Sequence, residues 1–165
     1  MKVAIIMGSD SDWPIVEPAS QLLAEFGIET EVIVASAHRT PDKVHGFASE
    51  ARSNGIEVII AAAGAAAHLA GVIAAYTTLP VIGIPINSTS LNGLDSLLSI
   101  VQMPAGIPVA TMGINGAKNA GIFAVQIMSG KHEKLIGKLA DYRTQMANEV
   151  EAKAIKLSTQ LSSGK

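Results

Sequence analysis

The stretch KVAIIMGSDSDW (Lys2–Trp13) joins a short apolar run to a glycine and a polar segment. The run Val3–Met7 ends at Gly8 and predicts a buried strand. From Trp13 to Phe26, apolar residues recur at the 3.6-residue spacing of an amphipathic helix, and Gly27 ends the pattern. This part of the chain therefore predicts a strand, a tight turn and a helix.

The same order recurs along the chain. Further strands are predicted at Thr30–Ala35, Glu57–Ala61, Pro80–Ile86 and Pro108–Met112. Helices are predicted at Thr40–Ser53, His68–Thr78, Asp95–Gln102 and Ala117–Met128. Strands that read as continuous apolar runs between helices are typical of a parallel sheet covered on both faces. We therefore expect an α/β fold, a flavodoxin-like three-layer sandwich with a five-stranded parallel sheet.

The last segment differs from the rest. Lys131–Leu157 is rich in charge and predicts a helix with no strand after it. One apolar stripe runs along this helix, formed by Leu135, Leu139, Tyr142, Met146, Val150 and Ala154. The stripe fits either an arm that docks on a neighbouring subunit or a helix that folds back on its own domain. We expect one domain over residues 1–165, with 131–160 as a terminal helical extension.

Composition excludes several classes of function. The chain has 165 residues, with 12 Lys and Arg against 14 Asp and Glu, so no basic excess is available for nucleic acid. The lack of Cys excludes disulfides, thiolate nucleophiles and zinc–thiolate or iron–sulfur sites. Charged residues make up only 16%, against about 25% in an average soluble domain. Between Glu57 and Lys118, Asp95 carries the only formal charge.

So few charges favour either a membrane segment or a surface buried by copies of the same chain. Val58–Leu94 is long enough to cross a bilayer, but glycines, prolines and a polar run interrupt it, and no Lys/Arg cluster flanks it. The apolar run Val3–Met7 is too short for a signal peptide. We therefore expect a cytoplasmic homo-oligomer without membrane or nucleic-acid partners.

Ligands of open parallel sheets bind beyond the carboxyl ends of the strands. After the first strand, Gly8–Asp12 brings hydroxyls and backbone N–H groups to a helix start, which suits a phosphate. Alternatively, Ser11 or Asp12 simply caps that helix. The loop has neither the Gly-Lys-Ser/Thr of a P-loop nor the Gly-x-Gly-x-x-Gly of a dinucleotide site, so nothing points to ATP or NAD.

The second loop, Ser36–Pro41, places His38 beside Arg39. Arg39 offers a planar fork for a phosphate, and His38 can give and take a proton near neutral pH. The alternative is that both are ordinary exposed loop residues. Together with the first loop, this pair predicts a small phosphorylated ligand and proton-transfer chemistry.

Two more loops complete the expected edge of the sheet. Ala62–His68 is built of small residues that let a ligand approach the backbone, and His68 is either a site residue or a structural one. Asn87–Asn92 is polar and uncharged, suited to neutral hydrogen bonds or to a plain turn. His45 and His132 are expected to face solvent. No metal-ligand cluster and no cofactor are predicted.

Four separated motifs resemble one known family. They are MGSDSDW (Met7–Trp13), SAHRTPDK (Ser36–Lys43), AAAHLAG (Ala65–Gly71) and SIVQMPAGIPVAT (Ser99–Thr111), and they are similar to the N5-carboxyaminoimidazole ribonucleotide (N5-CAIR) mutase family of purine (IMP) biosynthesis. The likeness extends to about residue 128. It implies a flavodoxin-like subunit in a homo-octamer. The implied reaction moves a carboxylate from the exocyclic nitrogen of N5-CAIR to a ring carbon, giving CAIR without ATP, biotin or metal.

The resemblance also implies roles for the residues of the first two loops. Ser9, Ser11 and Arg39 would hold the 5′-phosphate of the ribotide. Asp12 would bind the ribose hydroxyls, which accounts for an acidic residue beside a phosphate.

The remaining implied roles concern the ring and the reacting carboxylate. Ser36 and the backbone of Ala63 and Gly64 would line the ring. His38 would be the general acid and base, and His68 would orient the carboxylate. The implied path protonates the departing nitrogen, holds the released CO2 in a closed pocket and lets the ring carbon attack it.

Two alternatives to this function stay open. The first is the related AIR carboxylase, which takes up CO2 directly but has His-Lys-Gly where this chain has His38-Arg39-Thr40; this difference favours the mutase. The second, from another class, is a flavodoxin-like module that binds a flavin or nucleotide. Aromatic residues are only 4% of the chain, and Trp13 is the only one in the expected ligand loops.

The third loop departs from the family pattern. Ala62, Ala65 and Ala70 stand where the family has two glycines and a proline. If Ala65 must adopt a positive φ, the conformation costs about 1 kcal/mol.

Overall fold

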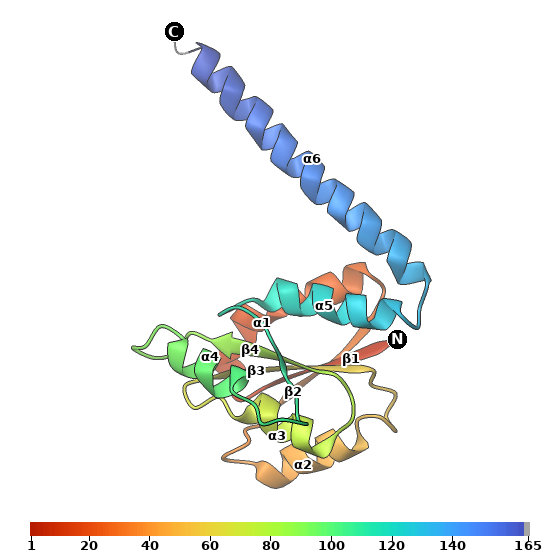
Figure 1. Ribbon diagram of the computed structural model, residues 1–165, viewed down its shortest axis with the longest axis vertical. Helices are drawn as coiled ribbons and strands as arrows, with labels where there is room; N and C mark the ends of the chain where they lie inside the picture. The colour runs from red at the N-terminus through yellow and green to blue at the C-terminus, as the bar shows by residue number, and fades with distance from the viewer. Residues whose placement is uncertain (164–165) are drawn as a thin grey trace.

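The computed structural model describes residues 1–163 and is built around one parallel sheet (Figure 1). The strand order is β2-β1-β3-β4-β5, the flavodoxin-like order. The strands are β1 (Lys2–Met7), β2 (Glu29–Val34), β3 (Val58–Gly64), β4 (Val81–Ile86) and β5 (Ala110–Thr111). The expected α/β class and five-stranded parallel sheet are confirmed.

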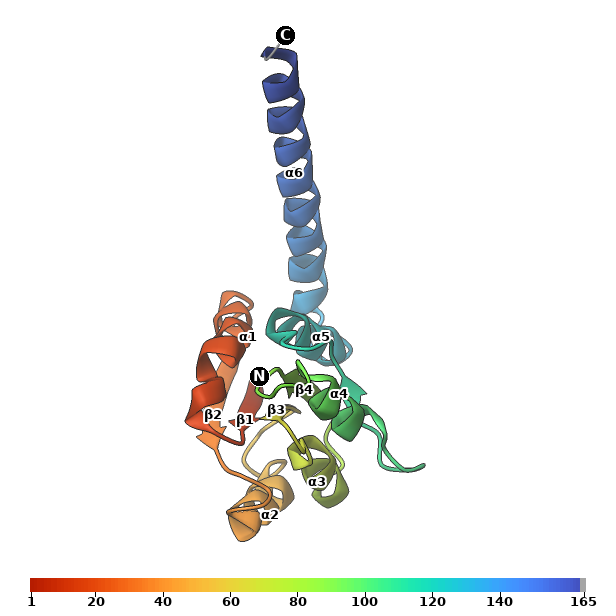
Figure 2. The same cartoon turned by 90° about the vertical axis from the view of Figure 1, so that its left-hand side faces the viewer.

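Helices cover both faces of the sheet. A short 3₁₀ turn, η1 (Asp10–Asp12), precedes the first of them. The helices are α1 (Trp13–Glu25), α2 (Pro41–Glu50), α3 (Leu69–Tyr76), α4 (Leu94–Val101), α5 (Ala117–Ser129) and α6 (Lys134–Ser163). Helices α1 and α5 lie on one face, and α2 and α3 lie on the other (Figure 2).

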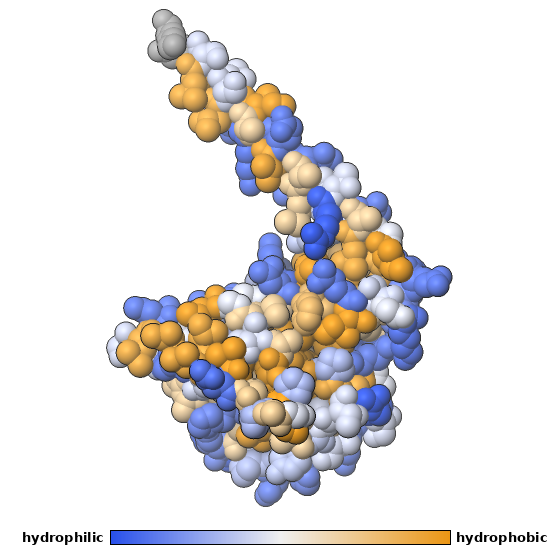
Figure 3. Space-filling view, in the orientation of Figure 1, coloured by the Kyte–Doolittle hydropathy of each residue, from blue (hydrophilic) through white to orange (hydrophobic). Residues whose placement is uncertain are grey.

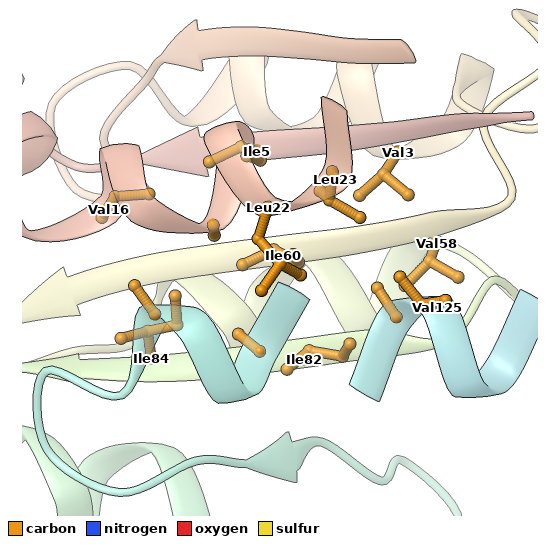
Figure 4. Close-up of a cluster of buried hydrophobic side chains, with 14 of the residues drawn as sticks. Val3, Ile5, Val16, Leu22, Leu23, Val58, Ile60, Ile82, Ile84 and Val125 are labelled. Atoms are coloured by element: carbon orange, nitrogen blue, oxygen red, sulfur yellow. The ribbon is translucent and has the colours of Figure 1, made fainter. Parts of the chain in front are cut away.

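The two faces are separated by the alternation of side chains along each strand. Val3, Ile5 and Met7 of β1 belong to the core beneath α1 and α5, whereas Ala4 and Ile6 belong to the core beneath α2 and α3. Figure 4 shows the first of these cores, where side chains of β1, β3 and β4 meet α1 and α5. Because both faces of the sheet are covered by helices and shielded from water, the inner strands are unbroken runs of apolar residues in the sequence.

Two strands differ from the sequence prediction by two residues or more in length. β3 extends three residues beyond its expected end, to Gly64, because it pairs on both sides, with Met7 opposite Ala62 and Ile86 opposite Gly64. β5 is only two residues long, and it pairs with β4 alone through Ile82 and Gly83. Ladder partners, which periodicity does not reveal, set both lengths.

Helix α6 extends away from the rest of the molecule (Figures 1 and 2). Leu135 is fully buried, and Leu139 and Tyr142 pack against the core. Farther along the same stripe, Met146 and Val150 are exposed. The predicted apolar stripe therefore folds back on its own chain at the base of the helix, and its outer part is exposed. No helix in that range has the length and apolar character that crossing a membrane requires.

The base of α6 is held by a cluster of charges around Glu57. His132 Nε2 lies 2.8 Å from Glu57 Oε2, Lys131 Nζ lies 3.1 Å from the same oxygen, and the Met1 amino group lies 3.8 Å from Oε1. The expectation that His132 faces solvent is wrong, because the α5–α6 turn brings it against the start of β3. His45 is exposed as expected, and its ring contacts Tyr76.

The charge cluster around Glu57 should make the stability of the fold depend on pH. Partial burial alone raises the pKa of the Glu57 carboxyl, but hydrogen bonds from His132 and Lys131 outweigh it and hold the pKa below its ordinary value of 4.5. A depressed carboxyl pKa stabilises the fold above the ordinary value, and the stabilisation disappears as the pH falls through the folded pKa. Glu57→Gln should therefore lower the free energy of unfolding by about 1 kcal/mol near neutral pH.

Urea unfolding at several pH values measures this effect. The difference between wild type and Glu57→Gln should shrink toward zero below pH 4.5. Glu133→Gln is the matched control, because Glu133 is an exposed carboxylate beside the same residues and forms no ion pair in the described part of the chain. Identical stability of Glu57→Gln and wild type at neutral pH would contradict the prediction.

Candidate active site

The loops after β1, β2 and β3 meet because their strands run parallel and in register. Gly8 N–H donates to Ala62 O at 3.2 Å, and Ala35 N–H donates to Met7 O at 3.0 Å, so the ladder continues to the ends of all three strands. A cavity of about 330 Å³ opens at this edge. All nine of the predicted site residues line it: Ser9, Ser11, Asp12, Ser36, His38, Arg39, Ala63, Gly64 and His68.

The serines of the first loop shape the turn before α1. Ser9 Oγ accepts the Ser11 N–H at 3.3 Å and the Ser11 hydroxyl at 2.8 Å, which makes Ser9 the cap of η1. Asp12 forms no capping bond to α1, although it stands at the cap position. The capping alternative is therefore wrong for Ser11 and Asp12.

Asp12 is a nearly buried carboxyl in the cavity wall. Only 8% of its surface is exposed. Desolvation raises the pKa of the Asp12 carboxyl, and hydrogen bonding with Ser11 and Ser9 offsets part of this effect. A carboxylate that is largely shielded from water is a good hydrogen-bond acceptor for the hydroxyl groups of a ligand.

Arg39 links the second loop to the first. Its Nη2 donates to Gly8 O at 2.8 Å, and no carboxylate of residues 1–163 pairs with it. A guanidinium carries five N–H donors, so most of them remain for an anion. The loop itself is braced by Thr40, whose Oγ1 accepts the Ser36 N–H at 2.9 Å and donates to Ser36 O at 3.0 Å. Ser36 Oγ in turn accepts the Arg39 N–H at 3.2 Å.

The two predicted site histidines form a pair across the cavity. His38 Nε2 and His68 Nδ1 are 2.9 Å apart, and the rings meet edge to face at 90°. Such a bond needs one proton between the two nitrogens, so one ring donates and the other accepts. His38 comes from the end of β2 and His68 from the start of α3, and thirty residues separate them in the sequence. Proton transfer is the chemistry that this pair supports.

The third loop contains backbone strain at Ala65, one of the positions where the sequence departs from the family pattern. Ala65 has a φ of 53°, in the left-handed region, where an L-residue with a Cβ is disfavoured. The same segment is less of a loop than expected, because Ala62, Ala63 and Gly64 belong to β3.

Six residues of the cavity wall were not predicted as site residues: Gly8, Ala37, Ala65, Ala66, Leu69 and Ser88. Of these, Ser88 adds a polar side chain. It belongs to the Asn87–Asn92 segment, for which the sequence analysis predicted neutral hydrogen bonds or a turn without choosing a residue. Its position directly after the fourth strand was the available signal.

A wider hollow of about 720 Å³ lies at the opposite edge of the sheet, before β4 and β5. Arg52 is the only charged residue in its described wall, and its Nη2 donates to Thr78 Oγ1 at 2.9 Å. The His38–His68 pair lies at the carboxyl edge and not in this hollow. No group of three or more His, Asp or Glu side chains within residues 1–163 is arranged to hold a metal ion.

Comparison with known proteins places this chain in a family. The AIR carboxylase family matches residues 2–149. The chain belongs to the AIR carboxylase family. Among its curated relatives is the N5-carboxyaminoimidazole ribonucleotide mutase of Thermotoga maritima, 54% identical over 156 residues that cover 94% of this chain and 91% of the relative. The family resemblance read from the four motifs is confirmed.

Other members of the AIR carboxylase family agree with this result. The N5-carboxyaminoimidazole ribonucleotide mutase of Pyrococcus abyssi is 59% identical over 145 residues, covering 88% of this chain and 83% of the relative. The crystal structure of Treponema denticola PurE superimposes with a TM-score of 0.85 at 29% identity, covering 94% of this chain and 98% of that chain. The family fold thus extends over nearly the whole chain.

The positive φ of Ala65 predicts that glycine at this position stabilises the protein. Ala65→Gly should raise the free energy of unfolding by about 1 kcal/mol, because glycine adopts a positive φ without the Cβ penalty. Ala66→Gly is the matched control: Ala66 is the exposed neighbour without a positive φ, and glycine there should lower stability. Denaturant unfolding measures both. A loss of stability in Ala65→Gly as large as that in Ala66→Gly would contradict the prediction.

Proposed function

We propose that this chain is an N5-CAIR mutase, which converts N5-CAIR to CAIR in purine biosynthesis. The observation that carries the proposal is the His38–His68 pair, which opens onto the same cavity as Arg39 and the serines of the first loop. One small cavity thereby holds an anion-binding end and a proton-transfer end. The names of the family relatives support the same reaction.

The phosphate and ribose of the substrate would occupy the β1–β2 side of the cavity. Arg39 and the hydroxyls of Ser9 and Ser11 are the donors there, suited to a 5′-phosphate. Asp12 would accept hydrogen bonds from the ribose hydroxyls. Fixing the substrate at this end positions the aminoimidazole ring over Ala63 and Gly64, beside Ser36 and the two histidines.

The chemistry in this proposal needs one proton and one acid–base group. Protonated His38 gives its proton to the exocyclic nitrogen as the bond from nitrogen to the carboxylate carbon breaks, which releases CO2 and aminoimidazole ribotide (AIR). The ring carbon attacks CO2 and forms the new carbon–carbon bond. Neutral His38 then removes the proton from that carbon, and CAIR results. His68 would orient the carboxylate and hold the shared proton.

These steps balance without another reactant, so we propose a reaction independent of ATP, metal and biotin. The protein must retain CO2 between the two halves of the reaction. The small residues of the cavity wall, Ala63, Gly64, Ala65 and Ala66, let the ring lie close to the backbone, where the bound substrate displaces water.

Substitution of the general acid–base group tests the proposal. His38→Asn should fold and bind CAIR but interconvert N5-CAIR and CAIR at least 100-fold more slowly, because general acid–base catalysis contributes about 10²–10⁴-fold. The measurement is conversion of N5-CAIR without ATP. His45→Asn is the control, since His45 is exposed and lies outside the cavity. Undiminished turnover by His38→Asn would rule out the assigned role.

The same assay separates the alternative functions. Use of AIR and bicarbonate with no turnover of N5-CAIR would identify an AIR carboxylase instead. A purified protein that carries a flavin and converts neither substrate would identify a binding module.

We also propose a cytoplasmic homo-octamer whose subunit is one domain with residues 131–160 as a helical extension. Leu94, Leu98 and Val101 lie on one face of α4 and are 52%, 48% and 48% exposed. Figure 3 shows the apolar surface that gathers over α4 at the left of the molecule, to which Leu91 and Ile114 contribute. A surface of this kind supports contact with other protein surfaces.

A further feature supports oligomerisation. The outer half of α6 exposes Met146 and Val150 on its apolar stripe. An exposed apolar stripe of this kind fits contact with another protein surface.

Sedimentation tests the oligomer. Eight copies of 17.0 kDa give a particle of about 136 kDa. Leu98→Ser should shift the distribution toward smaller species, because it places a polar group in the apolar face of α4. Leu161→Ser, at an exposed position near the end of α6, is the comparison that separates the two surfaces. A wild-type particle of 17.0 kDa would refute the proposed octamer.

A further inference from the structure

Ser88 is a cavity residue to which neither the motifs nor the family resemblance gives a role. It follows β4, whereas the other polar residues of the cavity wall come from the ends of β1, β2 and β3. Its hydroxyl forms no hydrogen bond within residues 1–163, although neighbouring hydroxyls do. Ser36 Oγ accepts from Arg39, and Thr89 Oγ1 donates to Asp95 Oδ2 at 2.7 Å.

The backbone on both sides of Ser88 is anchored. Asn87 N–H donates to Asn115 Oδ1 at 2.9 Å, and the Thr89 bond to Asp95 holds the other side to the start of α4. The backbone that carries the Ser88 hydroxyl is therefore held in place before a ligand arrives. Such preorganisation reduces the entropy lost on binding.

Gly64 explains how Ser88 reaches the cavity. A Cβ added to Gly64 would overlap Ser88 Oγ and lie 2.8 Å from Ser88 Cβ. Gly64 has no positive φ, so the close approach of Ser88 is the reason for a glycine here. Ser88 therefore lies directly against the strand end over which the aminoimidazole ring is proposed to sit.

The strand order indicates which part of the ligand would lie next to Ser88. The proposed phosphate site lies at the ends of β1 and β2, and β4 is two strands from β1, a distance of about 10 Å. Ser88 thus faces the ring end of the ribotide. Asp12, the acidic group of the cavity wall, belongs to the β1 loop, while His68 and Ser88 bring hydrogen-bond donors to the β3–β4 side. Asp95, which accepts from Thr89, lies outside the cavity wall, so no carboxylate of the wall faces these donors, and they suit an anionic substituent.

We propose that the Ser88 hydroxyl donates a hydrogen bond to the ring-borne carboxylate of CAIR. This inference rests on the proposed function. Ser88 binds the carboxylate on the side opposite the phosphate site and acts with His68 to hold it in the plane of the ring. No proton is transferred to or from Ser88.

Binding measurements with two ligands test the proposal. Ser88→Ala should weaken CAIR binding about tenfold, as expected for one hydrogen bond to a charged group. Binding of AIR, which has the same ribotide but no carboxylate, should change less than twofold. Calorimetric titration gives both dissociation constants. Ser90→Ala is the matched control, because Ser90 is an exposed serine of the same segment outside the cavity wall.

The outcomes separate this proposal from the proposed function. Unchanged CAIR binding in Ser88→Ala, or equal weakening for CAIR and AIR, overturns the role of Ser88 and leaves the mutase activity standing. A wild-type protein that binds CAIR but does not interconvert it with N5-CAIR overturns the proposed function, and the comparison of CAIR with AIR still decides Ser88.

A second pair of variants tests the packing on which the proposal depends. Gly64→Ala should destabilise the protein because its Cβ overlaps the Ser88 side chain. Adding Ser88→Gly should restore most of the stability, while CAIR binding stays at or below the level of Ser88→Ala. Full recovery of CAIR binding in the double variant would overturn the proposal.

Discussion

Hydrogen bonding between parallel strands is the constraint on which the rest of the structure depends. A strand buried on both faces has no water to satisfy its N–H and C=O groups, so each inner strand must pair on both sides. The register that results sets Met7 beside Val34 and Ala62, and Ala62 beside Ile84. Four strands thereby end at one edge, and the residues that follow them are brought together whatever their distance in the sequence.

The same constraint accounts for the mixture of strain and small residues at this edge. β3 is the strand next to β1 and β4, and its end passes under Ser88 at Gly64 before turning at Ala65. Ala65 has a positive φ of 53°. Strain of this kind persists only where packing over-determines the backbone, and it is common at ligand sites.

Scarcity of charge has two physical origins in this chain. Strands β3 and β4, which lie in this range, are buried on both faces and cannot carry charge. The remaining apolar residues, such as Leu94 and Leu98 on α4, are exposed in the isolated chain. Scattered apolar residues at a surface are ordinary, but a continuous apolar face on one helix fits an assembly better than a monomer.

Much of the site could be predicted because the motifs follow the strands closely. Each strand ends in a recognisable change from apolar to small or polar residues, so the sequence places His38, Arg39 and the first-loop serines at one edge. It does not show which hydroxyl is engaged. Ser36 and Ser88 are both serines after a strand, yet Ser36 Oγ accepts from Arg39 and the Ser88 hydroxyl forms no bond within residues 1–163. The distinction depends on backbone positions that only the folded chain defines.

By itself, the sequence determined the order of strands and helices, the flavodoxin-like class, the family and nine of the residues that line the cavity. The elements and the class follow from local patterns of apolar and small residues, which each segment carries independently of the others. The family and the site residues follow from the resemblance of four motifs. Tertiary structure decided the ends of β3 and β5, the His38–His68 bond, the contact of His132 with Glu57 and the place of Ser88. Each of these joins segments distant in the chain, and their geometry is set by strand pairing and packing, which no local pattern encodes.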